Sequence, residues 1–114
     1  MVHHPDSREA PISVVERASN GVTVVRLRGE HDLNSRDALT GVLDAQDGDL
    51  VVELRECEFI DSTIIGVLLA QARRRENAGA RFEVIAATDG TVARILEIVN
   101  ADAVLTMTWQ ERVG

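Results

Sequence analysis

The first part of the chain alternates apolar and polar residues with the period of a β-strand. Residues 12–16 and residues 22–28 are both strand-like, and the segment Ser19-Asn20-Gly21 between them is a hairpin turn signal. In the second segment the apolar positions and the arginines fall on opposite faces. The pattern predicts an antiparallel hairpin with one solvent-exposed face.

A short amphipathic helix is expected next. Gly29 interrupts the second strand, and residues 30–33 are expected to form a loop. Asn34 or Ser35 can cap a helix N-terminus, because their side-chain oxygens accept hydrogen bonds from unpaired backbone N–H groups. The helix is expected to end before an acidic turn at Gly48. Its apolar stripe, with spacing i, i+3, i+4, consists of Leu39, Val42 and Leu43.

The middle of the chain predicts a buried strand followed by a longer helix. Residues 50–54 are almost continuously apolar, which is typical of a central strand covered on both faces. After the polar residues 55–58, three residues that can cap a helix stand together at 61–63. Arg73, Arg74 and Arg75 near the helix end complement its dipole, and Gly79 suits the position after it. The helix stripe consists of Ile64, Ile65, Val67, Leu68, Leu69 and Ala72.

The rest of the chain repeats this strand and helix pattern. Residues 81–86 alternate as a strand, Thr88 or Asp89 can cap a helix, and residues 103–107 form a last strand. One face of that helix carries Val92, Ile95, Leu96 and Val99. The predicted fold is therefore α/β, in the order β-β-α-β-α-β-α-β: a mixed sheet of four to five strands with helices packed against it. We expect a flexible arm at 1–11, one domain at 12–108 and a tail at 109–114.

Composition excludes several functions. The 114 residues are 45% hydrophobic but only 3% aromatic, so the core must be aliphatic. All 12 basic residues are Arg, and without Lys the chain can form neither a lysine Schiff base nor a Walker phosphate loop. The net charge of −7 argues against nonspecific binding to nucleic acid or to anionic membranes.

Cysteine usage and the N-terminus indicate a compartment. The single cysteine, Cys57, can form no intramolecular disulfide and fits a reducing environment. No signal peptide and no membrane-spanning run is found. We therefore expect a cytoplasmic protein. Its acidity is concentrated in residues 29–61, which hold 10 acidic residues and 2 Arg. This segment either keeps the surface solvated or prepares it for a partner.

Few residues could support catalysis. His3 and His4 lie on the expected arm and His31 in the expected loop, where a histidine is usually solvated, so we predict no metal site and no cofactor. Asp32 and Asp61 each follow an apolar strand, and two such turns can meet at one edge of a sheet. They could serve a paired-carboxylate hydrolase, but helix capping explains them better in so small a domain.

Ser62 offers a different kind of chemistry. A hydroxyl at a helix N-terminus faces unpaired N–H groups and the positive end of the helix dipole, so a phosphate there is compatible with the fold. Position alone still favours an ordinary cap at Asp61 or Ser62.

Two motifs resemble the STAS domain family, and within it the bacterial anti-sigma factor antagonists. Residues 24–32, VVRLRGEHD, are similar to the family strand that ends in Gly-Glu-Leu-Asp. Residues 59–69, FIDSTIIGVLL, resemble its signature Phe-Ile-Asp-Ser-Ser/Thr-Gly-Leu-Gly-Val-Leu. The likeness covers about residues 12–108, and the expected third helix shares Val92, Arg94, Leu96 and Glu97 with the family pattern.

The resemblance implies a regulatory binding module and not an enzyme. Members bind an anti-sigma factor, usually a serine kinase, and so release a sigma factor; the kinase phosphorylates the antagonist and a phosphatase restores it. The phosphoacceptor would be Ser62, with Thr63 as the weaker candidate. The residues implied in partner binding are Asp32, Asp61, Ser62, Thr63, Ile64 and Gly66.

The sequence also departs from the family. Ile64 stands where the signature has glycine, and His31 replaces an apolar residue. A β-branched residue does not readily adopt positive φ, so we expect a remodelled turn and weaker kinase docking. A constitutive scaffold, or a partner-binding subunit of a transporter or signalling assembly, is therefore an alternative.

Overall fold

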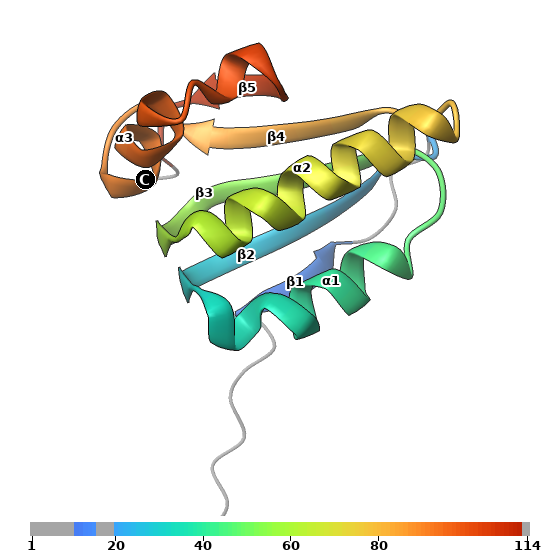
Figure 1. Cartoon of the computed structure of the whole chain (residues 1–114), viewed down its shortest axis with the longest axis horizontal. Coiled ribbons are helices and arrows are strands. Elements are labelled where there is room, and N and C mark those ends of the chain that lie inside the picture. Colours follow the sequence, from blue (N-terminus) through green and yellow to red (C-terminus); the bar gives the residue numbers. More distant parts are fainter. Residues whose placement is uncertain (1–10, 16–19, 113–114) are drawn as a thin grey trace, which may run out of the picture.

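The structure is a computed structural model that describes residues 11–15 and 20–112 (Figure 1). Apart from Pro11, the expected arm lies outside these residues, as do Glu16 of the first strand and Ser19 of the expected turn. Within them, five strands form one sheet: β1 (Ile12–Val15), β2 (Thr23–His31), β3 (Leu50–Ile60), β4 (Phe82–Ala87) and β5 (Thr106–Gln110). The helices are α1 (Arg36–Asp44), α2 (Ser62–Asn77) and α3 (Thr91–Ile98), with short 3-10 turns η2 (Leu33–Ser35) and η3 (Ala101–Ala103).

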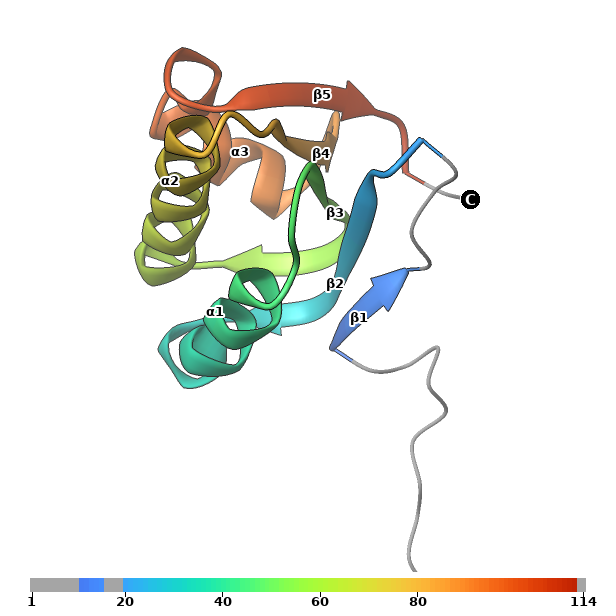
Figure 2. The same cartoon turned by 90° about the vertical axis from the view of Figure 1, so that its right-hand side faces the viewer.

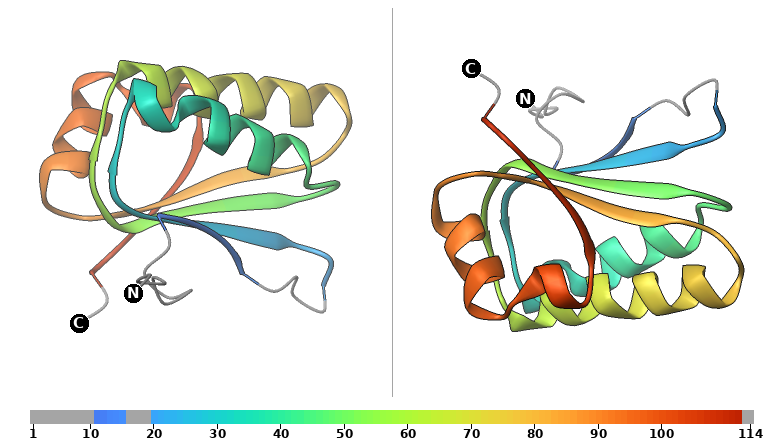
Figure 3. Two further views of the ribbon diagram at one scale, coloured as in Figure 1. Left: turned by 90° about the horizontal axis from the view of Figure 1, so that it is seen from below. Right: turned by 90° about the horizontal axis from the view of Figure 1, so that it is seen from above.

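The sheet is mixed, and its spatial strand order is the order of the chain, β1-β2-β3-β4-β5. β1 runs antiparallel to β2, whereas β2, β3, β4 and β5 are parallel. Each parallel connection passes through a helix and moves one strand further along the sheet. Right-handed connections of this kind put their helices on the same face, as Figures 2 and 3 show. The predicted α/β fold is confirmed.

An aliphatic core fills the space between the helices and the sheet. Phe82 is the one aromatic residue among the buried core residues of the described chain. The predicted stripes of α1 and α2 face this core, but in α3 the expected face is shorter, because Val99 is exposed. The fully buried side chains include Val25, Leu27, Leu39, Leu43, Val52, Ile64, Leu68, Val84 and Leu96.

Gly29 does not end β2, contrary to expectation. The strand continues to His31, and Gly29 adopts φ +74 beside a register shift: Gly29 pairs with Cys57, but the next residue, Glu30, pairs with Phe59. β3 thus has one extra residue at this point, which is a β-bulge. The glycine supplies the left-handed backbone that the irregular pairing needs and lets the strand continue.

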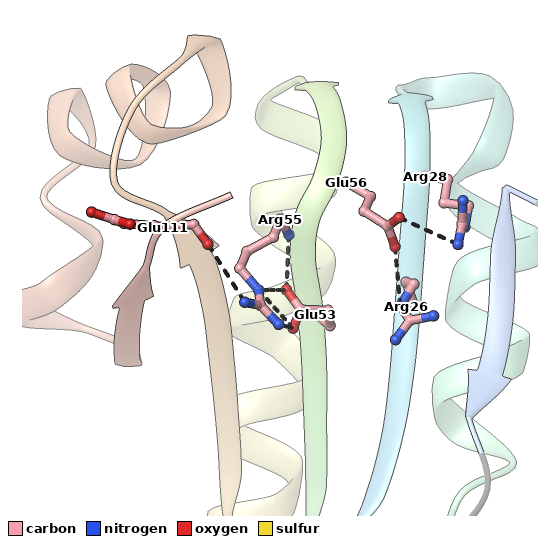
Figure 4. Close-up of polar contacts among 6 residues, drawn as sticks. All are labelled: Arg26, Arg28, Glu53, Arg55, Glu56 and Glu111. Atoms are coloured by element: carbon pink, nitrogen blue, oxygen red, sulfur yellow. Dashed lines mark hydrogen bonds and ion pairs between the residues drawn. The ribbon is translucent and has the colours of Figure 1, made fainter. Parts of the chain in front are cut away.

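β3 is also longer than predicted and includes the polar residues 55–58. Another register shift between the pairs Arg26–Glu53 and Arg28–Glu56 adds a residue to β3, so that both Arg55 and Glu56 lie on the face turned away from the helices (Figure 4). There Glu56 pairs with Arg26 at 3.2 Å and with Arg28 at 3.3 Å. Cross-strand ion pairs therefore keep these charged residues within a strand.

Arg55 also forms a close pair within β3. Its guanidinium donates to both carboxylate oxygens of Glu53, with Nη2 2.9 Å from Oε2 (Figure 4). Glu53 is buried, and its hydrogen bond is the main cause of the raised pKa of Arg55. The pair replaces the hydration that burial removes from the carboxylate.

The last helix and the last strand begin at other residues than the sequence predicted. α3 is capped by Gly90, at φ +98, and not by Thr88 or Asp89. The final strand begins at Thr106, because residues 101–103 form η3 instead of a strand.

The arginine run at the end of α2 binds the neighbouring helix, which the sequence interpretation missed. Arg74 pairs with Asp44 of α1, while Arg75 is buried and donates to the backbone oxygens of Leu43, at 2.6 Å, and Gly48, at 2.8 Å. Arg75 therefore stabilises the C-terminus of α1 as well as lying near that of α2. Burial is the main cause that lowers the pKa of its guanidinium.

Candidate functional site

The carboxyl ends of β2 and β3 bring the two candidate carboxylates to one edge of the sheet. His31 and Ile60, the last residues of these parallel strands, are register partners, and Asp32 and Asp61 follow them directly. Ser62 comes next as the first residue of α2. We call residues 30–33 and 58–62 the carboxyl edge.

Asp61 caps α2, as one of the two sequence-based alternatives predicted. Its Oδ1 accepts a hydrogen bond from the N–H of Ile64 at 3.1 Å. Ser62 is exposed and Thr63 is half-buried. The first turn of α2 contains no acidic residue, so Asp61 at the N-cap supplies the negative charge that interacts with the positive end of the helix dipole. This end of the helix can accommodate a phosphate on Ser62 without unfolding.

Ile64 does not remodel the turn, contrary to expectation. It lies inside α2, and among the described residues only Asn100 has positive φ without being a glycine. The Ile64 side chain is 0% exposed and belongs to the core, so it points away from the surface that Ser62 occupies. Gly66 is exposed, and a Cβ built there would meet nothing within 4 Å.

Asp32 caps the 3-10 turn η2 that follows β2. Ser35 occupies the N-cap position of α1, as one of the two expected alternatives, but its side chain makes no capping hydrogen bond to that helix. Asp32 Oδ1 accepts from the N–H of Asn34 at 2.9 Å, while the Asp32 N–H donates to Ser35 Oγ at 3.1 Å. These reciprocal bonds form a capping box around η2. The Asp32 carboxylate is thus held in a defined orientation, although its residue is only half-buried.

His31 is fully buried, although the sequence placed it in a solvated loop. Its Nε2 lies 3.0 Å from the carbonyl oxygen of Pro11 and 2.9 Å from that of Arg28, and its Nδ1 lies 3.1 Å from Ser35 Oγ. The signal that could have found it is the alternation of β2: Val25 and Leu27 face the core, and the same period leads to His31.

Two exposed apolar side chains accompany the acidic residues, and sequence reasoning missed both as surface features. Leu33 is 58% exposed beside Asp32, and Phe59 is 37% exposed two positions before Asp61. Glu30 and Glu58 are exposed at the same ends of the strands. Contiguous apolar area rimmed by polar residues marks protein contact sites, and Leu33 and Phe59 supply exposed apolar area at this acidic edge.

Cys57 is buried beneath this edge, and its thiol is unreactive near neutral pH. Its Sγ lies 3.4 Å from the carbonyl oxygen of Phe59. Burial disfavours the thiolate and raises the pKa of Cys57 to about 11. The thiol therefore stays protonated near neutral pH and is not a nucleophile there.

The raised pKa predicts a loss of stability at high pH. Above the ordinary value of 9.0 the unfolded chain releases the Cys57 proton first, so the free energy of unfolding should fall by about 2 kcal/mol between pH 9 and 11. With no Lys or Tyr in the sequence, other side chains should contribute little in this window. Urea unfolding at several pH values measures the slope. Cys57→Val should show almost none, and equal slopes for both proteins would contradict the assignment.

The arrangement suits recognition better than catalysis. Both carboxylates act as caps, and a groove of about 720 Å³ in the described part of the chain is lined by residues such as Val24, Leu50 and Phe82 and by neither Asp32 nor Asp61. Among the described residues, no three His, Cys, Asp or Glu side chains are grouped as metal ligands. In the same part of the chain, every helix is too short or too polar to cross a membrane.

Comparisons with known proteins follow the fold and the motifs. A family model described as "Mlab, STAS domain" matches residues 14–107. An anti-sigma factor antagonist from Mycobacterium paratuberculosis has a similar structure, with a TM-score of 0.70 and 25% identity over 84% of each chain. The antagonist SpoIIAA in its unphosphorylated form has a TM-score of 0.63 and 17% identity, over 85% of this chain and 86% of its own.

A putative anti-sigma factor antagonist from Thermotoga maritima is also similar, with a TM-score of 0.65 and 17% identity, over 88% of this chain and 85% of its own. No curated protein matches the sequence.

Proposed function

This chain belongs to the STAS domain family, and we propose that it is a cytoplasmic anti-sigma factor antagonist switched off by phosphorylation of Ser62. In this proposal it binds an anti-sigma factor that is a serine kinase, and so releases a sigma factor for transcription. A phosphatase would reverse the modification.

The observation that carries the proposal is the exposed Ser62 at the first position of α2. Asp61 beside it is committed to capping the helix, and the parallel pairing of β2 with β3 brings Asp32 to the same edge. The hydroxyl is therefore presented on a rigid helix start that a kinase can approach from solvent. Ile64, which replaces the family glycine, is in the core and leaves this approach open.

Phosphorylation would act as a release signal through charge. A phosphoserine adds about −1.5 to −2 charge to an edge that already carries Asp32, Asp61 and the exposed Glu30 and Glu58. A kinase site presents a catalytic carboxylate and nucleotide phosphates to the acceptor hydroxyl. Like charges would then face each other across a close contact, while the helix dipole keeps the modified domain folded.

The first experiment maps the phosphate. The purified protein is incubated with its cognate anti-sigma kinase and ATP, and modified peptides are identified by mass spectrometry. We expect one phosphate, on Ser62, that disappears in Ser62→Ala and persists in Thr63→Ala. Absence of both modification and complex formation would contradict the proposal.

The second experiment tests the release signal. Ser62→Glu should weaken binding to the kinase about tenfold or more, because it places a negative charge at the contact. Thr106→Glu is the matched control: Thr106 is exposed at the start of β5, at the opposite end of the parallel strands, and this variant should bind within about twofold of wild type. Equal loss in both variants would indicate an effect of net charge only.

A second candidate function is a constitutive partner-binding subunit of a transporter or signalling assembly. It fits the family match equally well, because that match shows a STAS domain and carries no statement about phosphorylation. In that case Ser62→Glu would leave partner binding unaltered.

A further inference from the structure

The buried ring of His31 has one nitrogen whose proton is fixed by its neighbours. Nε2 faces the carbonyl oxygens of Pro11, at the entry to β1, and of Arg28, in β2. Carbonyl oxygens only accept hydrogen bonds, so Nε2 must carry a hydrogen and donate it. The ring is thereby hydrogen-bonded both to the residue that precedes β1 and to β2 itself.

The other nitrogen reaches the Asp32 turn through Ser35. Ser35 Oγ lies 3.1 Å from His31 Nδ1, accepts the N–H of Asp32 at 3.1 Å, and lies 3.2 Å from the Asp32 carbonyl oxygen. Its hydroxyl hydrogen can go either to Nδ1 or to that carbonyl. Because Nε2 carries the ring hydrogen, Nδ1 accepts, and the ring is linked to the turn when the hydroxyl donates to Nδ1. The imidazole, the hydroxyl and the Asp32 N–H, which donates to the same Oγ, then form one continuous hydrogen-bonded unit.

We propose that His31 is a positioning residue that, through Ser35, holds the Asp32 turn in the conformation the partner recognises. The inference rests on the proposed function, because it takes the carboxyl edge as the partner site. Asp32 is half-buried and its neighbour Leu33 is exposed, so packing alone restrains this turn weakly. A turn that is ordered before binding loses less conformational freedom when the partner docks.

The first test needs no partner. Amide hydrogen exchange is measured by NMR in wild type, His31→Leu and Ser35→Ala. Leucine keeps an apolar side chain of similar size in the buried position but makes neither hydrogen-bonded link. We expect the Asp32 N–H to exchange about tenfold faster in both variants, while amides near Val25 in the middle of β2 keep their protection.

The second test measures affinity for the anti-sigma kinase. Each variant should bind about three- to tenfold more weakly than wild type, and the double variant no more weakly than the worse single variant, because the two residues act as one unit. Phe82→Leu is the control for general destabilisation. Phe82 is buried at the first position of β4, which is the end of the parallel strands away from the carboxyl edge. The control variant should bind like wild type.

The outcomes separate the two proposals. Unchanged exchange at Asp32 in His31→Leu overturns the positioning role whatever the partner does. Additive losses of affinity in the double variant, or an equal loss in Phe82→Leu, also overturn it. A third outcome is faster exchange of the Asp32 N–H in the variants while the wild-type protein forms no complex with the kinase. That outcome contradicts the proposed function, and with it the part of this inference that concerns binding.

Discussion

Replacing Ile64 with glycine is expected to lower the free energy of unfolding by about 4 kcal/mol. The side chain is 0% exposed and packs in the core, so its removal leaves a cavity among the surrounding aliphatic residues. Truncating a buried isoleucine to alanine costs about 2–5 kcal/mol, and glycine inside a helix costs about 1 kcal/mol more. Urea unfolding followed by the fluorescence of Trp109, which lies in β5, measures the change.

Gly66→Ala is the matched control for Ile64→Gly. It lies two positions further along α2, is exposed, and has room for a methyl group. We expect alanine there to raise the free energy of unfolding by about 0.5–1 kcal/mol, because it favours the helix. If Ile64→Gly lost little stability, Ile64 would not be packed in the core and the remodelled turn expected from the sequence would be correct.

Replacing Arg75 with methionine is expected to cost about 2–3 kcal/mol. Methionine fills much of the same space but removes the guanidinium donor from the backbone oxygens of Leu43 and Gly48, while the Leu43 oxygen keeps the N–H of Gln46. Hydrogen bonds from a charged group contribute about 1.5–3 kcal/mol each. Removing a desolvated guanidinium, whose Nε has no hydrogen-bond partner among the described residues, offsets part of the loss.

The arginine run supplies its own control for Arg75→Met. Arg73 is exposed two positions earlier, so Arg73→Met should change the free energy of unfolding by less than about 0.5 kcal/mol. Arg75→Lys keeps the charge but has fewer hydrogen-bond donors. Its loss of free energy of unfolding should lie between those of Arg73→Met and Arg75→Met. Similar losses from Arg73→Met and Arg75→Met would show that the helix dipole, and not the contact with α1, explains the run.

The sequence predicted the elements that local periodicity determines. The stripes of α1 and α2 and the apolar run at the start of β3 were sufficient for the order of elements and the mixed sheet, because these patterns are set by neighbours in the chain. The cap at Asp61 followed from a short-range rule of the same kind.

What could not be predicted depends on pairing between distant segments. The bulge at Gly29 and the extension of β3 beyond Leu54 come from register shifts between β2 and β3, which neither strand encodes alone. His31 is buried because β2 continues past Gly29, so the alternation that begins at Val25 extends to it. Arg75 binds residues 27 and 32 positions earlier in the chain, a separation that helix periodicity does not report.

The carboxyl edge was predicted in part. The meeting of Asp32 and Asp61 was anticipated, because both follow strands that the topology makes neighbours. The inward orientation of Ile64 also agrees with the apolar stripe predicted for α2, whereas the remodelled turn expected from the loss of the family glycine was wrong. The buried side chain of Ile64 shows that this departure from the motif changes the core and not the surface beside Ser62.

The agreement between strand order in space and in the chain also bears on how the protein is made. Each strand lies beside the strand that precedes it in sequence. A strand can therefore pair as soon as it is made, because no later strand is inserted between two earlier ones. During synthesis, which proceeds from the N-terminus at about 5–20 residues per second, the sheet can grow at one edge as each strand and helix emerges. The edge that carries Ser62 would then be assembled once α2 has packed, before β4 and β5 are added.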